Sequence, residues 1–491
     1  MYTYQDLLAI DPSDEERRMD FVYSLIQQHE ASDLYKTAQL ADEYDRQENR
    51  TISRYQKFLR DDLGRLIPDN YSPNYKLASN YFNRFITQEN QYLLGNGVVW
   101  QNESTKARLG ENFDSRLQQT GRFALSGGVA FGFWNYDHLE AIPVYSRDSA
   151  RFAPLFDEVN GSLSAGAQYW QIDGTKPLTA ILHEPDGHTM YAWNRRKDSD
   201  AGQRTYREVL QKKQPYIVKR KRTGTTETFY EYRNYPTFPI VPLWGNPRRQ
   251  SEITGIRAQI DAYDLIKSGF ANDLDNAQIY WILKNAGGMD DAEIARFLRR
   301  LKALGGASLQ TGGTSTGGGA DVQPVPVNIP WESREKLLDR LERDLYRDFM
   351  ALDTYHIASG AMTATQIRAA YEQLNSKADQ YEYCVIEFLN GILAVADIED
   401  KPTFSRSAVI NAQEEIQLVL QAAPYLDDET VTRKIMTILG MADQTEAVLR
   451  RKAAEDVERL NAVQSKPDDN NDDNADDTDE TESGGLKGAS L

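Results

Sequence analysis

The stretch at residues 238–278, FPIVPLWGNPRRQSEITGIRAQIDAYDLIKSGFANDLDNAQ, organises the chain around a strand and a long helix. Its apolar start is typical of a short strand, and Gly245, Asn246 and Pro247 end that strand. Ser251 is a natural N-cap for the helix. After Ser251, apolar residues recur at helical spacing: Ile253, Ile256, Ile260, Tyr263, Phe270 and Leu274.

Two helical patterns follow this stretch toward the C-terminus. Residues 331–352 place apolar side chains on one face: Leu338, Leu341, Leu345, Phe349 and Leu352. Thr363 and Gln366 then form a capping box. From there an apolar stripe alternates steps of four and three: Ile367, Tyr371, Leu374, Ala378, Tyr381, Val385, Phe388, Ile392 and Val395. A helix of about 33 residues is roughly 50 Å long, so we expect it to lie along something extended, a coiled coil or neighbouring elements.

The N-terminal half combines helices with a strand-rich region. Residues 14–60 are predicted to be helical behind a capping box of Ser13 and Glu16, and residues 77–94 form a second predicted helix. Short strands are predicted from about 95 to 245, including a hairpin at 217–232. Its basic run, Lys219 to Arg222, is read as an exposed strand face more readily than as a nucleic-acid contact. Residues 407–464 form a last helical group, so the predicted class is α+β, predominantly α.

Composition and charge exclude several classes of protein. The 491 residues hold 56 basic and 74 acidic residues, a net charge of -18, which argues against a protein that coats DNA by neutralising phosphates. The single cysteine, Cys384, excludes an internal disulfide framework and a Cys-based zinc site. No signal peptide and no apolar run of membrane-spanning length is apparent, so we expect a soluble, intracellular-type protein. Residues 465–491 are acidic and lack core-forming residues, which predicts a disordered tail.

Catalytic signatures are not found in the sequence. The histidines are scattered, and His183 and His188, which flank a turn, are expected to be solvent-exposed. A predicted helix at about 290–304 ends with basic residues: Arg296, Arg299, Arg300 and Lys302. The glycine-rich loop at 305–319 lacks the ending of a phosphate-binding P-loop. These observations favour a structural or assembly protein without cofactor, metal or catalytic residues.

The stretch 238–278 resembles the wing-to-stem junction of portal proteins of tailed double-stranded DNA bacteriophages. The matching elements are Asn246, Ser251-Glu252, Asp261-Ala262-Tyr263-Asp264, Ser268 and Asn272-Asp273. Three more segments resemble family elements in the family's order. They are NYKLASNYFNRFITQENQYLLGNGVVW (74–100), SGAMTATQIRAAYEQLNSKADQYE (359–382) and LDDETVTRKIMTILGMADQTEAVLRRKAAED (426–456).

The resemblance implies a portal-protein fold with a mixed α/β wing, paired stem helices, a long spine helix and a helical crown. The implied parts are an N-terminal helical segment (1–30), wing (31–250), first stem helix (251–276), clip (277–330), second stem helix (331–352), tunnel loop (353–363), spine (364–400), crown (401–464) and acidic tail (465–491). The tunnel loop would face DNA with Thr354, Tyr355, His356, Ile357, Ala358, Ser359 and Gly360. Stem and oligomer packing would use Ile256, Ile260, Tyr263, Leu338, Leu341 and Leu345, and the clip would dock partners through Arg296, Arg299, Arg300 and Lys302.

The same resemblance implies a ring of about twelve subunits at one capsid vertex. Its implied partners are other copies of the chain, the large subunit of the terminase, major capsid and scaffolding proteins, a head-completion or adaptor protein, and double-stranded DNA in the channel. The implied location is the virion, with assembly in the host cytoplasm and no membrane contact. A metal-dependent nuclease and a capsid scaffold are the alternatives, although the strand-rich region argues against a scaffold.

Overall fold

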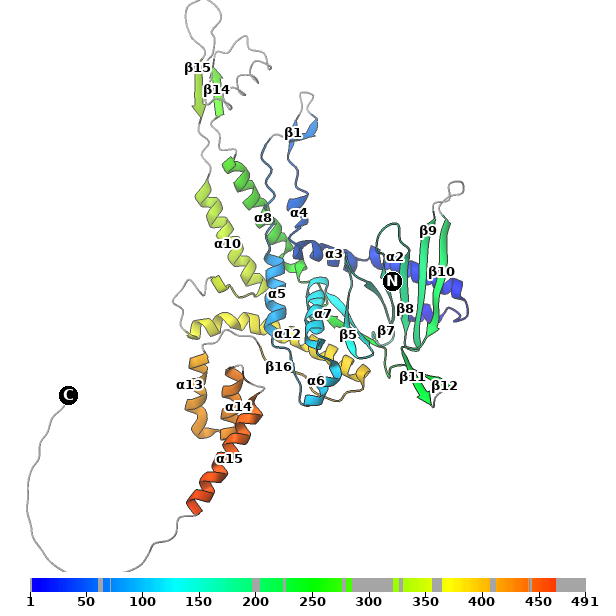
Figure 1. Cartoon of the computed structure of the whole chain (residues 1–491). Coiled ribbons are helices and arrows are strands. Elements are labelled where there is room, and N and C mark those ends of the chain that lie inside the picture. Colours follow the sequence, from blue (N-terminus) through cyan, green and yellow to red (C-terminus); the bar gives the residue numbers. More distant parts are fainter. Residues whose placement is uncertain are drawn as a thin grey trace, which may run out of the picture. The chain divides into compact units, whose positions relative to one another are not determined.

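We describe a computed structural model of the chain. It describes residues 2–60, 65–70, 72–196, 204–223, 227–275, 280–284, 321–325, 330–355, 364–406, 412–439, 441 and 444–464. Residues 1–407 form one compact unit and residues 408–491 another. Helices and antiparallel sheets coexist in the first unit, so the predicted α+β class is confirmed (Figure 1).

The N-terminal helices are α1 (Tyr4–Leu8), α2 (Glu15–Ala31), α3 (Asp33–Asp45) and α4 (Arg50–Ser53). The prediction that Ser13 caps α2 was wrong. Asp14 is the N-cap, because its side chain accepts a hydrogen bond from the backbone nitrogen of Arg17, while the Ser13 hydroxyl donates to Asp11. The helical region predicted for 14–60 ends at Ser53, and a short hairpin follows, formed by β1 (Phe58–Arg60) and β2 (Leu66–Pro68).

Two antiparallel sheets form the body of the first unit. The larger has the order β10-β9-β8-β7-β6, with β6 (Arg151–Phe156), β7 (Leu163–Trp170), β8 (Leu178–Glu184), β9 (Gly187–Arg196) and β10 (Arg204–Gln214). The apolar face of α2 packs on this sheet, and a buried ion pair of 2.5 Å joins Arg18 of α2 to Glu184. The smaller sheet has the order β13-β4-β5, with β4 (Val129–Asn135), β5 (His138–Pro143) and β13 (Ile240–Trp244). The predicted hairpin is confirmed as β11 (Ile217–Thr223) and β12 (Glu227–Arg233).

Helices α5 (Tyr81–Leu94), α6 (Glu103–Leu109) and α7 (Phe113–Gly127) pack around the smaller sheet. The sequence pattern missed α6 and α7, because they lie in a region whose texture is that of short strands. Helix α12 (Ala364–Ala396) coincides with the predicted long helix. It lies directly on β4, where a Cβ atom at Gly132 would be only 2.4 Å from the Phe388 ring. A two-stranded pair of β3 (Val98–Val99) and β16 (Thr403–Phe404) lies beyond the end of α12.

The sequence left open whether the long helix packs in a coiled coil or along neighbouring elements, and the structure shows the second arrangement. The stripe residues from Leu374 to Val395 are buried within the chain's own core, against α5, β4 and β13. The sheet and α5 supply the extended partner that a helix of this length requires. Ring formation must therefore be argued from other surfaces.

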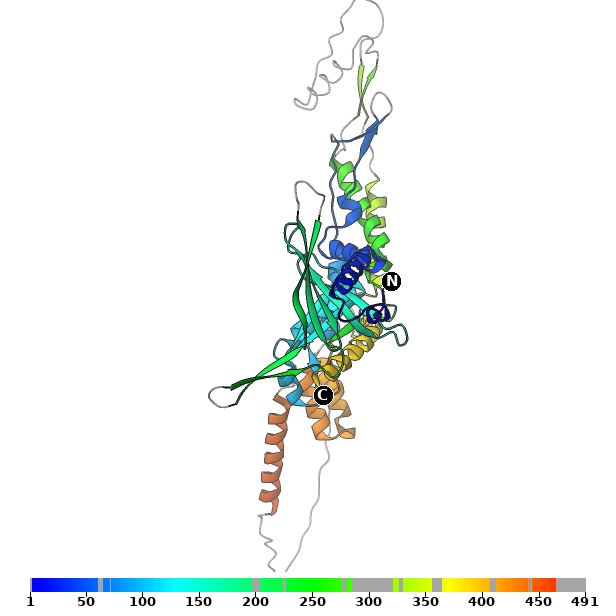
Figure 2. The same ribbon diagram turned by 90° about the vertical axis from the view of Figure 1, so that its right-hand side faces the viewer.

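Helices α8 (Ile253–Asp275) and α10 (Trp331–Phe349) lie side by side in both views (Figures 1 and 2). An ion pair of 2.5 Å joins Arg334 of α10 to Asp273 of α8, and Gln259 donates a hydrogen bond to Asp348. The segment between the two helices includes an antiparallel pair of β14 (Tyr280–Lys284) and β15 (Asp321–Val325). The predicted helix at 290–304 and the glycine-rich loop lie outside the described residues.

The second unit consists of helices in the residues that the structure describes there. They are α13 (Ala412–Ala422), the 3-10 helix η1 (Ala423–Tyr425), α14 (Asp428–Ile438) and α15 (Thr445–Gln464). Asp427 caps α14 by accepting a hydrogen bond from the backbone nitrogen of Thr430. The helical group predicted for 407–464, with its break at Pro424, is confirmed over these ranges. The predicted disordered tail at 465–491 lies outside the described residues.

Candidate functional site

The candidate site is the junction where α10 ends and the predicted tunnel loop begins. Met350 adopts a left-handed conformation (φ 62°) and ends the helix. The next turn is clamped, because the Gln88 side chain accepts a hydrogen bond from the backbone nitrogen of Leu352 (3.0 Å) and donates one to its carbonyl oxygen (2.9 Å). Tyr355 is 81% exposed just beyond this clamp. The candidates from His356 to Gly360 lie outside the described residues.

A buried charged cluster joins the helices on both sides of that loop. Lys377 of α12 contacts Glu252 at 2.8 Å and Glu89 of α5 at 3.1 Å. It also donates a hydrogen bond of 3.2 Å to the carbonyl oxygen of Phe349 at the end of α10. Glu252 and the Phe349 carbonyl oxygen accept hydrogen bonds from Lys377, whereas Glu89 Oε2 makes an ion-pair contact without a hydrogen bond. Lys377 therefore ties α12 directly to the last turn of α10.

The cluster holds two carboxyl groups and one ammonium group, so a single positive charge cannot neutralise both carboxylates. Burial, the largest effect, raises the pKa of Glu89 to about 8; the nearby Lys377 opposes this rise and Glu252 adds to it. Only 2% of the Glu89 side chain is exposed, which is why burial outweighs the attraction of Lys377 there.

A second polar arrangement holds an extended segment along α8. Asn272 accepts a hydrogen bond from the backbone nitrogen of Tyr75 (2.6 Å), Ser268 from that of Leu77 (3.0 Å) and Asp264 from that of Ser79 (2.9 Å). Helix positions four apart are separated by about 6 Å, and alternate residues of an extended chain by about 6.6 Å. This match lets Asp264, Ser268 and Asn272, here called the polar ladder, bind every second amide.

The polar ladder is almost completely buried, which the sequence did not reveal. Asp264 is 0% exposed, and it also accepts a hydrogen bond from the side-chain amide of Asn49. Burial raises the pKa of Asp264, while its hydrogen bonds with Asn49 and Ser79 act in the opposite direction. The three residues continue the face of Ile256 and Ile260 at intervals of four. This spacing was the one feature of the sequence that could have indicated their burial. Polar residues on a helix are ordinarily exposed, however, so the spacing alone did not predict it.

The other residues that carry the 238–278 pattern also make defined contacts. Asn246 donates to Glu252, which binds Lys377, and Ser251 donates to the carbonyl oxygen of Ser126. Asp261 accepts a hydrogen bond from Tyr44. The pattern thus corresponds to the contacts that hold α8 to the rest of its unit.

The predicted stem-packing residues divide into two groups. Ile256, Ile260 and Leu345 are buried in the core of their own chain, and Tyr263 packs edge-on against Tyr81 (5.1 Å between ring centroids). Leu338 and Leu341 are half-buried on α10. The predicted clip residues Arg296, Arg299, Arg300 and Lys302 lie outside the described residues.

The expectation of two exposed turn histidines was wrong. His183 is 2% exposed and stacks on Tyr216 (5.9 Å between ring centroids), and burial, with a smaller effect of His188, lowers its pKa to about 3. His188 is half-buried beside it, and burial lowers its pKa too. Among the residues that the structure describes, no three His, Cys, Asp or Glu side chains gather closely enough to hold a metal ion. Within the same ranges, no helix combines the length and the apolar character that crossing a bilayer requires.

Comparisons with known proteins identify similar chains among phage portal proteins. The family model described as "Phage portal protein, SPP1 Gp6-like" matches residues 26–460. A portal protein of Clostridium phage phiCD119 is 24% identical over 222 residues, which are 41% of this chain and 48% of that protein. A portal protein of Bacillus phage SPP1 is 23% identical over 352 residues, which are 67% of this chain and 64% of that protein. The chain therefore spans between about half and just under two thirds of the length of these relatives.

Proposed function

Because the chain belongs to the SPP1 Gp6-like family of phage portal proteins, we propose that it forms a ring of about twelve subunits at one vertex of a phage capsid. In this proposal the ring is the conduit through which double-stranded DNA is packaged and later ejected. The protein acts as a structural part of the virion and not as an enzyme.

The observation that carries the proposal is the helix pair α8 and α10 with its two different ends. One end continues into β14 and β15, and the other end of α10 leads through Leu352 to the predicted tunnel loop at 353–363. Repeated around an axis, such pairs would line a wall, and equivalent loops would meet inside it. A small loop can then narrow the bore. The clamp by Gln88 and the cluster around Lys377 would fix where that loop leaves the wall.

The charge of the chain suits a passage through which DNA slides. Phosphate contacts by Lys and Arg set much of the affinity for DNA, and residues 353–363 contain neither. A ring of chains that each carry -18 repels the duplex, and salt limits this repulsion to about 8 Å from the wall. We therefore assign to Thr354, Tyr355, His356, Ile357, Ala358, Ser359 and Gly360 a contact with DNA by shape and weak polar interaction.

The partners follow from the same role. The clip at 277–330 would dock the large subunit of the terminase during packaging and a head-completion or adaptor protein afterwards, with Arg296, Arg299, Arg300 and Lys302 as the candidate contacts. Major capsid and scaffolding proteins would surround the wing. Assembly would take place in the host cytoplasm, and the finished ring would stay in the virion at the capsid vertex.

The mass of the purified full-length chain in solution tests this proposal. Twelve chains of 55.8 kDa give roughly 670 kDa, which native mass spectrometry separates easily from a monomer or dimer. The proposal expects a single closed species near that mass. Monomers or dimers alone at micromolar concentration and above would contradict it.

A further inference from the structure

Two exposed apolar surfaces lie on the helix pair. The first belongs to residues 54–79, here called the arm, which contains β1 and β2 and ends in the segment held by the polar ladder. Among its described residues (54–60, 65–70 and 72–79), the exposed large apolar side chains are 37% to 65% accessible: Tyr55, Phe58, Leu66, Ile67, Tyr75 and Leu77. The second surface is on α10, where Trp331 is 54% and Leu337 is 44% exposed. Exposed apolar side chains that gather in this way mark interaction surfaces.

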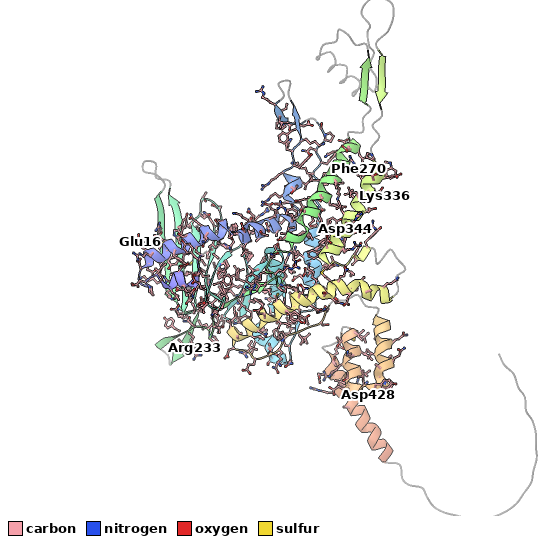
Figure 3. The ribbon with its side chains drawn as sticks, turned by 180° about the vertical axis from the view of Figure 1, so that it is seen from behind. Glu16, Arg233, Phe270, Lys336, Asp344 and Asp428 are labelled. Atoms are coloured by element: carbon pink, nitrogen blue, oxygen red, sulfur yellow. The ribbon has the colours of Figure 1, made fainter. Side chains whose placement is uncertain are left out.

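The arm and α10 lie on opposite sides of α8. Ser268 of α8 binds the arm at the amide of Leu77, whereas Phe270 faces the guanidinium group of Arg334 on α10, 6.0 Å from its ring centroid. Two residues turn a helix by about 200°, so these two positions point in opposite directions. Figure 1 shows α8 between α10 and β1, and Figure 3 labels Phe270 on α8 and Lys336 on α10.

The two surfaces also lie at the same level along α8. Asp275 accepts a hydrogen bond of 3.4 Å from the Tyr75 hydroxyl, and Asp273 pairs with Arg334, which is three residues from Trp331. The last turn of α8 therefore carries Tyr75 on one side and the start of α10 on the other. Because α8, about 10 Å wide with its side chains, stands between them, the two surfaces cannot cover each other within one chain.

We propose that the arm of one subunit packs on α10 of the next subunit, with Tyr75 and Trp331 at the centre of the contact. Different surfaces on opposite sides of one element make a head-to-tail contact, which forms a ring when its rotation closes. The charges next to the two central side chains are complementary, since Lys76 is exposed beside Tyr75 and Glu332 beside Trp331, whereas farther along α10 both signs occur, with Glu335 and Lys336 exposed. The interface rests on the proposed function, because it takes the ring as its setting.

Cross-linking in the full-length chain tests the interface. Lys76→Cys and Glu332→Cys, which lie next to Tyr75 and Trp331 and leave both aromatic side chains in place, are combined, and a short bifunctional thiol reagent is added, since the native Cys384 is buried. The interface predicts a ladder of covalent multimers beyond the dimer for the double variant and no ladder for either single variant. Covalent dimers from Lys76→Cys alone would indicate a symmetric contact and overturn the proposal.

A charge substitution provides the second measurement. Trp331→Lys is expected to weaken ring formation by about tenfold or more, because a buried aromatic anchor is lost at the interface. Val159→Lys is the matched control, since Val159 is 91% exposed on the loop between β6 and β7, and it should leave the ring intact. Wild-type-sized rings from both the double-cysteine protein and Trp331→Lys, without a ladder, would overturn the interface alone. A monomeric wild-type chain would instead overturn the proposed function.

Discussion

Asp264→Ala is expected to detach segment 75–79 from α8. The Asp264 carboxylate accepts hydrogen bonds from the backbone of Ser79 and the side chain of Asn49, and alanine would leave the Ser79 amide without this acceptor and Asn49 with only its hydrogen bond to the carbonyl oxygen of Ser79. Each such loss costs about 1–3 kcal/mol, so the two together cost about 2–6 kcal/mol. Burial raises the pKa of Asp264, so the ionised carboxylate is itself costly to bury, and we expect the lower half of that range.

Hydrogen–deuterium exchange of a peptide that covers 75–79, together with denaturant unfolding, measures this effect. The Asp264→Ala protein should exchange these amides faster and unfold at lower denaturant concentration. Ser268→Ala removes one hydrogen bond and should cost about 1 kcal/mol. Asp339→Ala on the exposed face of α10 is the control and should change stability by less than about 0.5 kcal/mol. Unchanged exchange at 75–79 in Asp264→Ala would refute the role of the polar ladder.

Three further predictions concern the junction, the loop and the tail. The unfolded chain releases the Glu89 proton above about pH 4.5, whereas the folded chain keeps it to about pH 8, so the free energy of unfolding falls as the pH rises through that window. Glu89→Gln should make the midpoint of denaturant unfolding depend less on pH. An equally steep fall in Glu89→Gln would contradict the prediction. Replacing Tyr355, His356 and Ile357 with Gly or Ser should leave assembly intact and impair DNA packaging or retention; normally filled heads would make the loop a mere connector. Truncation after Gln464 should change neither native mass nor thermal stability, and lost assembly would assign the tail a structural role.

The sequence predicted those parts of the fold whose apolar residues follow one period without interruption. The stripe from Leu374 to Val395 identified α12 with its correct length, and it also identified the buried face. It could not identify what covers that face. A periodic stripe looks the same whether it packs in a coiled coil or on a sheet of its own chain, so the sequence left both arrangements open.

The parts that escaped prediction depend on contacts between residues far apart in the chain. The burial of Asp264 becomes intelligible only with Ser79, which is 185 residues away in the sequence. His183 is buried against Tyr216, which stacks on its ring and is 33 residues away in the sequence. From the sequence alone, polar residues such as Asp264 and His183 are predicted to be exposed, because their distant partners are not known. The end of α10, in contrast, depends on nearby residues: the sequence predicted that this helix ends at 352, shortly before Thr354 and Tyr355, and the structure ends it at Phe349.

Electron microscopy of the purified full-length chain tests the central claim most directly. Averaged views along the symmetry axis should show a closed ring of about twelve subunits around an open channel, with a narrowing at the level of residues 353–363. Single particles without rotational symmetry, open filaments or discs without a channel would contradict the account.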